Sequence, residues 1–302
     1  DAVIVAALAT EVARIDNPAR IAAQIRGVTR EGERCSSFEG CRQLTDVRAD
    51  IDYDGPSGDI DLLGDGQSGD GSFSVLEVTS TGALAAVSSE SADVPPPPDD
   101  VPVPDPGSGP RADGKLVVGM VLPTAGPNGP AGAAARAGIR VAVDEINHAG
   151  GVVGQPVELV FGDAGDGSEA QVRAAAKVAV DAQADVVIGG LGPGDTGRLV
   201  QAVAGAGVVL ISPGAPGSVS GDLARSGLFF RLSPPVSVQG AVLAAAAADD
   251  GNTKVTLVHG DDADGPRFRM LQVVREFGLE VLAARGERAA VGARHAACFA
   301  RL

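Results

Sequence analysis

A proline-rich stretch divides this chain into two parts. Residues 94–110 read VPPPPDDVPVPDPGSGP. Proline fixes its φ angle and has no N–H to donate, so a run this rich in proline favours an extended, semi-rigid spacer over packed structure. We therefore expect two separately organised segments, residues 1–90 and 115–302, joined by a linker over residues 91–114.

The segment after the spacer alternates strands and helices. Short apolar runs alternate with longer alanine-rich stretches, which predicts an α/β fold with a parallel, doubly wound sheet and right-handed crossovers. A second, incomplete sheet is expected to follow. The expected strands are 116–122, 156–163, 185–190, 208–212 and 228–233, then 254–260 and 279–284, and the expected helices are 131–147, 168–182, 195–204, 236–248 and 267–277.

The segment before the spacer has a different pattern. An apolar helix is expected over residues 1–13. Asn17 and Pro18 then supply an N-cap and a first-turn proline for a second helix that runs to about Val28. After a stretch dense in turn-forming residues, residues 73–78 alternate like a strand.

Composition excludes several classes of function. The chain has 302 residues and a formal net charge of −15, which repels phosphate backbones and anionic lipid surfaces, so nucleic acid is not an expected partner. No apolar stretch reaches the roughly 20 residues that a spanning helix needs, so membrane insertion is not expected. Residue 1 is Asp, and no signal-peptide pattern follows it, so we expect a processed product or a fragment.

The three cysteines are informative by their spacing. Cys35 and Cys41 bracket only five residues of a polar segment that we expect to be a loop. A close pair in a loop indicates a local disulfide and an oxidising compartment; two free thiols are the alternative. Cys298 is left over. No metal site is expected, because the histidines share no ligand spacing with the cysteines; they are His148, His259 and His295.

Five segments after the spacer carry a resemblance to a known family. They are KLVVGMVLPTAGPNG, AGIRVAVDEINHAGGVVGQPVELVFGD, VVIGG, VVLISPGAP and LFFRLSPP. In order and spacing they resemble type I periplasmic solute-binding proteins of the branched-chain amino-acid (leucine/isoleucine/valine) transport class, over residues 115 to about 285. The resemblance implies a type I periplasmic-binding-protein-like fold, with a doubly wound first lobe over 115–231 and a partial second lobe over 232–302.

The segment before the spacer resembles the opposite end of the same family. DAVIVAALATEV, IAAQIRGV, CSSFEGC, DYDGPSGDIDL and FSVLEV carry this likeness. The chain therefore looks like the tail of one binding module, a spacer and the head of the next; a circular permutant is the lower-ranked alternative. This arrangement implies that residues 1 to about 65 dock on residues 115–230 and complete the first lobe.

The resemblance also implies where a ligand lies. In this family a free amino acid occupies the interlobe cleft at the carboxyl ends of strands, beside helix N-termini that suit a carboxylate. The matching candidates are Asn128, Gly192, Pro193, Gly194, Asp195, Thr196, Ser212, Gly214, Ala215 and Pro216. The match departs from the family at Gly192–Pro193 and Pro216, where the family offers a serine and a threonine, and at Ala131, where it has an aromatic. Asp195 is expected to repel a carboxylate.

Other motifs are weaker. Residues 192–197 fit G-x-G-x-x-G but follow the third strand, and no acidic residue ends the next strand, so no nucleotide cofactor is expected. Asp50, Asp52, Asp54, Gly55 and Asp61 fit part of a calcium loop, although the bidentate Glu and the following helix are missing, so a solvated acidic turn is favoured. No catalytic constellation appears, and an enzyme is not expected.

These expectations combine into one hypothesis of function. We expect an extracytoplasmic solute-binding module of an ABC-type transport system, periplasmic or secreted, that binds a small polar ligand such as a branched-chain amino acid. Its implied partners are the small-molecule ligand and a membrane permease complex. The alternative is a tandem extracellular sensory or interaction protein whose ligand site is degenerate.

Overall fold

The computed structural model describes residues 1–80, 82–93, 104, 109–110, 112–214, 226–234 and 236–249. They belong to two compact units, which are treated separately below. The first unit comprises residues 1–71 and 93–235, and the second comprises residues 72–92 and 236–302. The expected elements beyond residue 249, together with Ala215, Pro216 and Cys298, lie outside the described residues.

The first unit is built on a parallel five-stranded sheet. Its strand order is β6-β5-β7-β8-β9, and every neighbouring pair is parallel. The strands are β5 (Val117–Leu122), β6 (Glu158–Asp163), β7 (Val186–Gly189), β8 (Val209–Ser212) and β9 (Phe229–Arg231). The expected doubly wound α/β fold is therefore confirmed.

Four of the five strands of this sheet are completely buried. Each residue of β5, β7, β8 and β9 is buried, as the continuous apolar runs predict for a sheet covered on both faces. Strand β6 is a sheet edge and is only partly buried. The apolar core consequently lies along the central strands, between two layers of helices.

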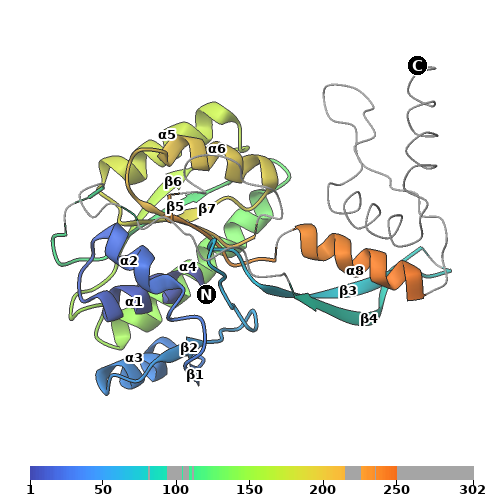
Figure 1. The fold of residues 1–302 in the computed structure, drawn as a ribbon. Helices are drawn as coiled ribbons and strands as arrows, with labels where there is room; N and C mark the ends of the chain where they lie inside the picture. The colour runs from blue at the N-terminus through green and yellow to red at the C-terminus, as the bar shows by residue number, and fades with distance from the viewer. Residues whose placement is uncertain are drawn as a thin grey trace, which may run out of the picture. The chain divides into compact units, whose positions relative to one another are not determined.

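Helices cover both faces of this sheet (Figure 1). Helices α5 (Glu169–Asp181) and α6 (Pro193–Val203) contact each other and lie on one face. On the other face lie α4 (Gly129–His148), α1 (Ala2–Ala13) and α2 (Pro18–Ile25). Among the described residues, no helix combines the length and the hydropathy needed to cross a membrane.

The N-terminal segment docks on the sheet, as expected. Helix α1 contacts α4 and β7, and α2 contacts β8. Both helices were predicted from the sequence, and the Asn17 side chain caps α2 by accepting the N–H of Arg20 at 3.2 Å. Residues 2–11 of α1 are all buried. Because α1 has no solvent-facing stripe over most of its length, it is a core element of the first unit.

Three carboxylates fix this docked segment. Asp16 Oδ2 accepts the backbone N–H groups of residues 113, 114 and 115 at 2.8, 2.9 and 3.1 Å. Glu11 Oε1 accepts the N–H of Val153 at 2.6 Å, and Glu145 Oε1 accepts the N–H of Phe38 at 3.0 Å. Charge-assisted bonds of this kind satisfy backbone donors that the docking would otherwise bury unpaired.

The disulfide predicted from spacing is present. Cys35 and Cys41 are bonded, and they join β1 (Glu33–Cys35) to α3 (Phe38–Asp46). Strand β1 pairs in parallel with β2 (Ile51–Tyr53). The expected loop was wrong for both cysteines, because Cys35 ends β1 and Cys41 lies inside α3. Ser37 caps α3 by accepting the N–H of Gly40 at 3.2 Å.

The described part of the second unit is small. Strand β3 (Asp70–Val78) pairs with β4 (Leu84–Asp93), and the first residues of β3 belong to the first unit. In the turn between the two strands, Gly82 donates its N–H to Thr79 O at 2.9 Å. The strand expected over residues 73–78 corresponds to β3, while β4 was not expected. Helix α8 (Val236–Asp249) matches the helix expected over residues 236–248.

Candidate functional site

The carboxyl ends of β5 and β7 form the candidate site. The chain passes from β5 to β6 on one side, whereas β7 leads to β8 on the other side. Open parallel sheets bind their ligands at such a reversal of strand order. Asn128 lies in the loop after β5, residues 190–196 follow β7, and Ser212 ends β8.

Asn128 and Asp195 join the first two of these loops. Asn128 Nδ2 donates to Asp195 Oδ2 at 2.8 Å, although Asn128 stands at the N-cap of α4, where its side chain makes no cap hydrogen bond. Asp195 Oδ1 also lies 3.6 Å from Arg198 Nη1. A side chain at Gly192 would place its Cβ 2.8 Å from Asn128 Nδ2. The Asp195 carboxylate is therefore compensated from two sides.

Two hydroxyl groups shape the loop after β7. Thr196 Oγ1 donates to Gly192 O, and Ser212 Oγ donates to Gly190 O, each at 2.9 Å. Both residues are buried, with 1% and 0% of their surfaces exposed. Gly190 has φ of +80°, and a Cβ there would lie 2.6 Å from Thr196 Oγ1. These hydroxyls brace the loop instead of facing solvent.

The N-terminus of α6 points its first amides at this edge. Gly192 is the N-cap in extended conformation, and it makes no side-chain cap hydrogen bond. The first amides of a helix have no intrahelical acceptor and favour anions. Within the described residues, no acceptor is bonded to the N–H groups of Gly194 and Asp195. The edge thus offers two donors suited to a small anion.

A third loop, after β6, completes the edge. Asp163 Oδ1 accepts the Thr124 hydroxyl at 2.6 Å and the N–H of Gly165 at 2.8 Å, and these bonds lower the pKa of Asp163. Arg198 Nη1 donates to Gly167 O at 2.9 Å, which ties α6 to the same loop. Three loops from separate βα units therefore form one connected surface.

The structure brings most of the sequence candidates together. Asn128, Gly192, Asp195 and Thr196 meet at one point, Ser212 joins them through Gly190 O, and Gly214 lies nearby, where a Cβ would be 4.0 Å from Leu191 O. Pro193 and Gly194 form the first turn of α6. Sequence reasoning missed Thr124, Asp163 and Arg198, although Arg198 stands three residues after Asp195 on the same helix, a spacing that favours an ion pair.

The acidic residues weighed as a calcium loop lie in and around β2. Asp52 lies in β2, and its pKa is raised by burial and by the neighbouring Asp54 and Asp61 carboxylates. Asp54 instead lies 3.4 Å from Arg34 Nε. In the described residues, no group of three or more His, Cys, Asp or Glu side chains is arranged to hold a metal ion.

Comparison with known sequences identifies the family. The sequence profile of the family described as periplasmic binding protein matches residues 115–286, which is more than half of the chain. This chain belongs to the periplasmic binding protein family. The match includes the whole five-stranded sheet, so the carboxyl edge described above is a feature of the family domain and not of the N-terminal segment.

Curated relatives of this binding protein are similar over part of their length. A Leu/Ile/Val-binding protein homolog 1 from Brucella melitensis is 31% identical over 147 residues, which are 48% of this chain and 38% of the relative. The Leu/Ile/Val-binding protein BraC3 from Rhizobium johnstonii is 33% identical over 122 residues, 39% of this chain and 31% of the relative. The chain thus spans less than two fifths of the length of these proteins.

Two solved structures are similar to part of this chain. The branched-chain amino acid transporter substrate-binding protein LivJ from Streptococcus pneumoniae, in complex with isoleucine, is 28% identical with a TM-score of 0.39, covering 45% of this chain and 38% of LivJ. An ABC transporter substrate-binding protein from Desulfitobacterium hafniense, in complex with Leu, is 27% identical with a TM-score of 0.37, covering 45% of this chain and 39% of that protein.

Proposed function

We propose that this chain is part of an extracytoplasmic solute-binding protein of an ABC-type transport system, with a branched-chain amino acid as ligand. The observation that carries the proposal is the pair of unpaired amides, Gly194 and Asp195, at the carboxyl edge of a periplasmic binding protein domain. Relatives named as Leu/Ile/Val-binding proteins support this choice of ligand. The Cys35–Cys41 disulfide supports a periplasmic or secreted location.

The roles of the site residues follow from their contacts. The amides of Gly194 and Asp195 bind the ligand carboxylate, and Pro193 sets the start of the helix that presents them. Asn128 and Thr196 hold the loop in place, and Ser212 braces it from the end of β8. Gly214, Ala215 and Pro216 are proposed as ligand contacts from the family resemblance alone. Asp195 is compensated by Asn128 and Arg198, which removes the repulsion that an isolated aspartate would exert on a carboxylate.

We also propose the division of the chain between modules. Residues 1–90 are the C-terminal segment of one solute-binding module, residues 91–114 are a spacer, and residues 115–302 begin a second module. The docking of residues 1–71 on the sheet supports this division, because the segment completes a lobe that starts after the spacer. A membrane permease complex is the proposed partner of the complete protein.

Isothermal titration calorimetry with leucine, isoleucine and valine tests the ligand proposal. At a ligand concentration of one hundred times Kd, the free energy of unfolding should rise by about 2.7 kcal/mol, which a thermal melt detects. A chain that gives neither heat nor stabilisation with any of the three at millimolar concentration would contradict the proposal.

A charge substitution tests the site itself. Asn128→Asp places a second carboxylate beside Asp195 and should weaken amino-acid binding about tenfold or more, since the added negative charge then repels the ligand carboxylate. Asn147→Asp is the matched control: it adds the same charge to the same helix, roughly 28 Å away along the axis. Equal effects of the two variants would exclude this edge as the carboxylate site.

A further inference from the structure

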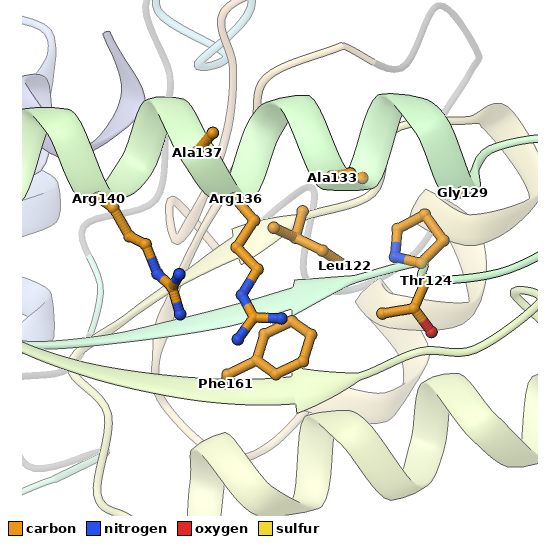
Figure 2. Close-up of a pocket in the computed structure, with 10 residues that line it drawn as sticks. Leu122, Thr124, Gly129, Ala133, Arg136, Ala137, Arg140 and Phe161 are labelled. Atoms are coloured by element: carbon orange, nitrogen blue, oxygen red, sulfur yellow. The ribbon is translucent and has the colours of Figure 1, made fainter.

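A cavity of about 310 Å³ lies between α4 and the strands β5 and β6 (Figure 2). This volume is at the low end of the range for small-molecule sites. The cavity begins at Thr124 and extends along α4 to Arg140. It includes none of residues 190–196 or Ser212, and the two sites share only Thr124 among the residues named for the carboxyl edge.

Two arginines from α4 give the cavity its charge. Arg136 and Arg140 are one helical turn apart, and Figure 2 shows both side chains reaching from the helix toward the strands. The Arg136 guanidinium lies 3.9 Å from the centroid of the Phe161 ring, and its Nε is buried with no hydrogen-bond partner. Like charges four residues apart on a helix repel each other.

The described surroundings do not neutralise this pair. Among the described residues, no carboxylate oxygen lies within 4.0 Å of either guanidinium, in a chain whose formal net charge is −15. Asp163 attracts Arg136 at longer range, but its Oδ1 is already bonded to the Thr124 hydroxyl and the Gly165 amide. An anion bound between the arginines would remove their repulsion.

The walls of the cavity are apolar. Leu122 and Phe161 line it from the strands, and Ala133 and Ala137 line it from the helix. We propose that this cavity is a binding site for a small organic carboxylate with an apolar body, such as an aromatic acid. The carboxylate pairs with the two guanidinium groups, which offer planar N–H donors, and the apolar body contacts the Leu122 and Phe161 side.

Calorimetry of the full chain with benzoate tests this site, with benzamide and inorganic phosphate as comparators. Benzoate should bind, and more weakly as salt is added, because salt screens the guanidinium charges. Benzamide and phosphate should each bind at least tenfold more weakly, since one lacks the charge and the other lacks the apolar body. No benzoate binding at millimolar concentration, or equal binding of benzamide, would overturn the proposal.

Matched variants locate the binding. Arg136→Gln/Arg140→Gln should weaken benzoate binding at least tenfold, and Arg20→Gln/Arg173→Gln, which removes two exposed arginines elsewhere, should leave it unchanged. Ala133→Leu fills the cavity and should also weaken binding, whereas Ala134→Leu changes the next, non-lining position of the helix. Benzoate binding that survives both cavity variants would place it elsewhere.

A competition experiment separates this site from the proposed amino-acid site. Leucine should bind equally well with and without saturating benzoate, and the Arg136→Gln/Arg140→Gln variant should bind leucine like the parent. Displacement of benzoate by leucine would show that the two share one site and would overturn the inference. If leucine does not bind at all, benzoate binding still tests the cavity by itself.

Discussion

Asp185 is the residue in which burial has the largest consequence for charge. Only 2% of its surface is exposed, and its Oδ2 accepts the N–H of Val117 at 2.9 Å. Its backbone carbonyl accepts the N–H of Val209, so the residue joins β5, β7 and β8. Burial raises the pKa of this carboxyl from 3.8 to about 8, with a further contribution from the charges of Asp16 and Asp113.

This shift gives stability a pH dependence of definite sign. In the unfolded chain Asp185 loses its proton near pH 3.8, whereas in the folded protein it keeps the proton until about pH 8. The folded state therefore binds more protons between these values, and the contribution of Asp185 to the free energy of unfolding falls as pH rises through this interval. Asp185→Asn retains an acceptor for Val117 but has no proton to lose.

Urea denaturation at pH 5, 6.5 and 8 measures this effect. The Asp185→Asn variant should show a flatter dependence on pH than the parent and should be more stable than the parent at pH 8. Asp46→Asn, at an exposed position of α3, is the control and should leave the parent's pH dependence unchanged. Parallel curves for the parent and the Asp185 variant would contradict the prediction.

Residue-level inference from sequence succeeded where the signal was local. The Asn17 cap and the Cys35–Cys41 disulfide depend on neighbours within a few residues, and both were predicted correctly. The role of Ser212 was not predictable, because its acceptor is Gly190 O, on another strand–loop unit. The raised pKa of Asp185 was missed for the same reason. It arises from burial in the folded protein and from the charges of Asp16 and Asp113, which are distant in sequence.

At the scale of elements, the disulfide is the covalent tie between β1 and α3. Because it closes a short loop, the chain-entropy argument gives a stabilisation of about 2 kcal/mol. Cys35→Ala/Cys41→Ala should therefore lower the free energy of unfolding by about this amount in urea denaturation. Reductant should lower the stability of the parent similarly and leave the variant unchanged. A parent whose stability is unaffected by reductant would refute this.

Helix α3 is one of the elements that the sequence did not predict. Its residues are mostly polar and include Gly40, so they show little apolar periodicity, and the two cysteines drew attention to a loop. The helix is stabilised from outside: Phe38 is fully buried, and Glu145 of α4 accepts its N–H. By contrast, β5, β7 and β8 show continuous apolar runs that predicted them as strands, since burial on both faces requires such a run.

At the scale of the molecule, the first unit is assembled from segments on both sides of the spacer. Helix α1 supplies fully buried side chains, among them Val5 and Leu8, to the same core as β5 and β7. Each such side chain contributes about 1.5–3 kcal/mol by its burial. Association of the two segments should therefore survive loss of the covalent connection between them.

Cleavage within the spacer tests this directly. A specific protease site inserted between Pro98 and Asp99 allows the folded chain to be cut after purification. The two fragments should then elute together in size-exclusion chromatography and separate only in denaturant, because the buried α1 surface and the Asp16 and Glu11 hydrogen bonds hold them.

Leu8→Ala, at a position with 0% exposure, should lower the urea concentration at which the cut fragments separate, since it removes about 2–5 kcal/mol of core packing. Val12→Ala, on the same helix with 40% exposure, should change it little. Fragments of the parent that elute apart in native buffer would show that the N-terminal segment is not an integral part of this lobe.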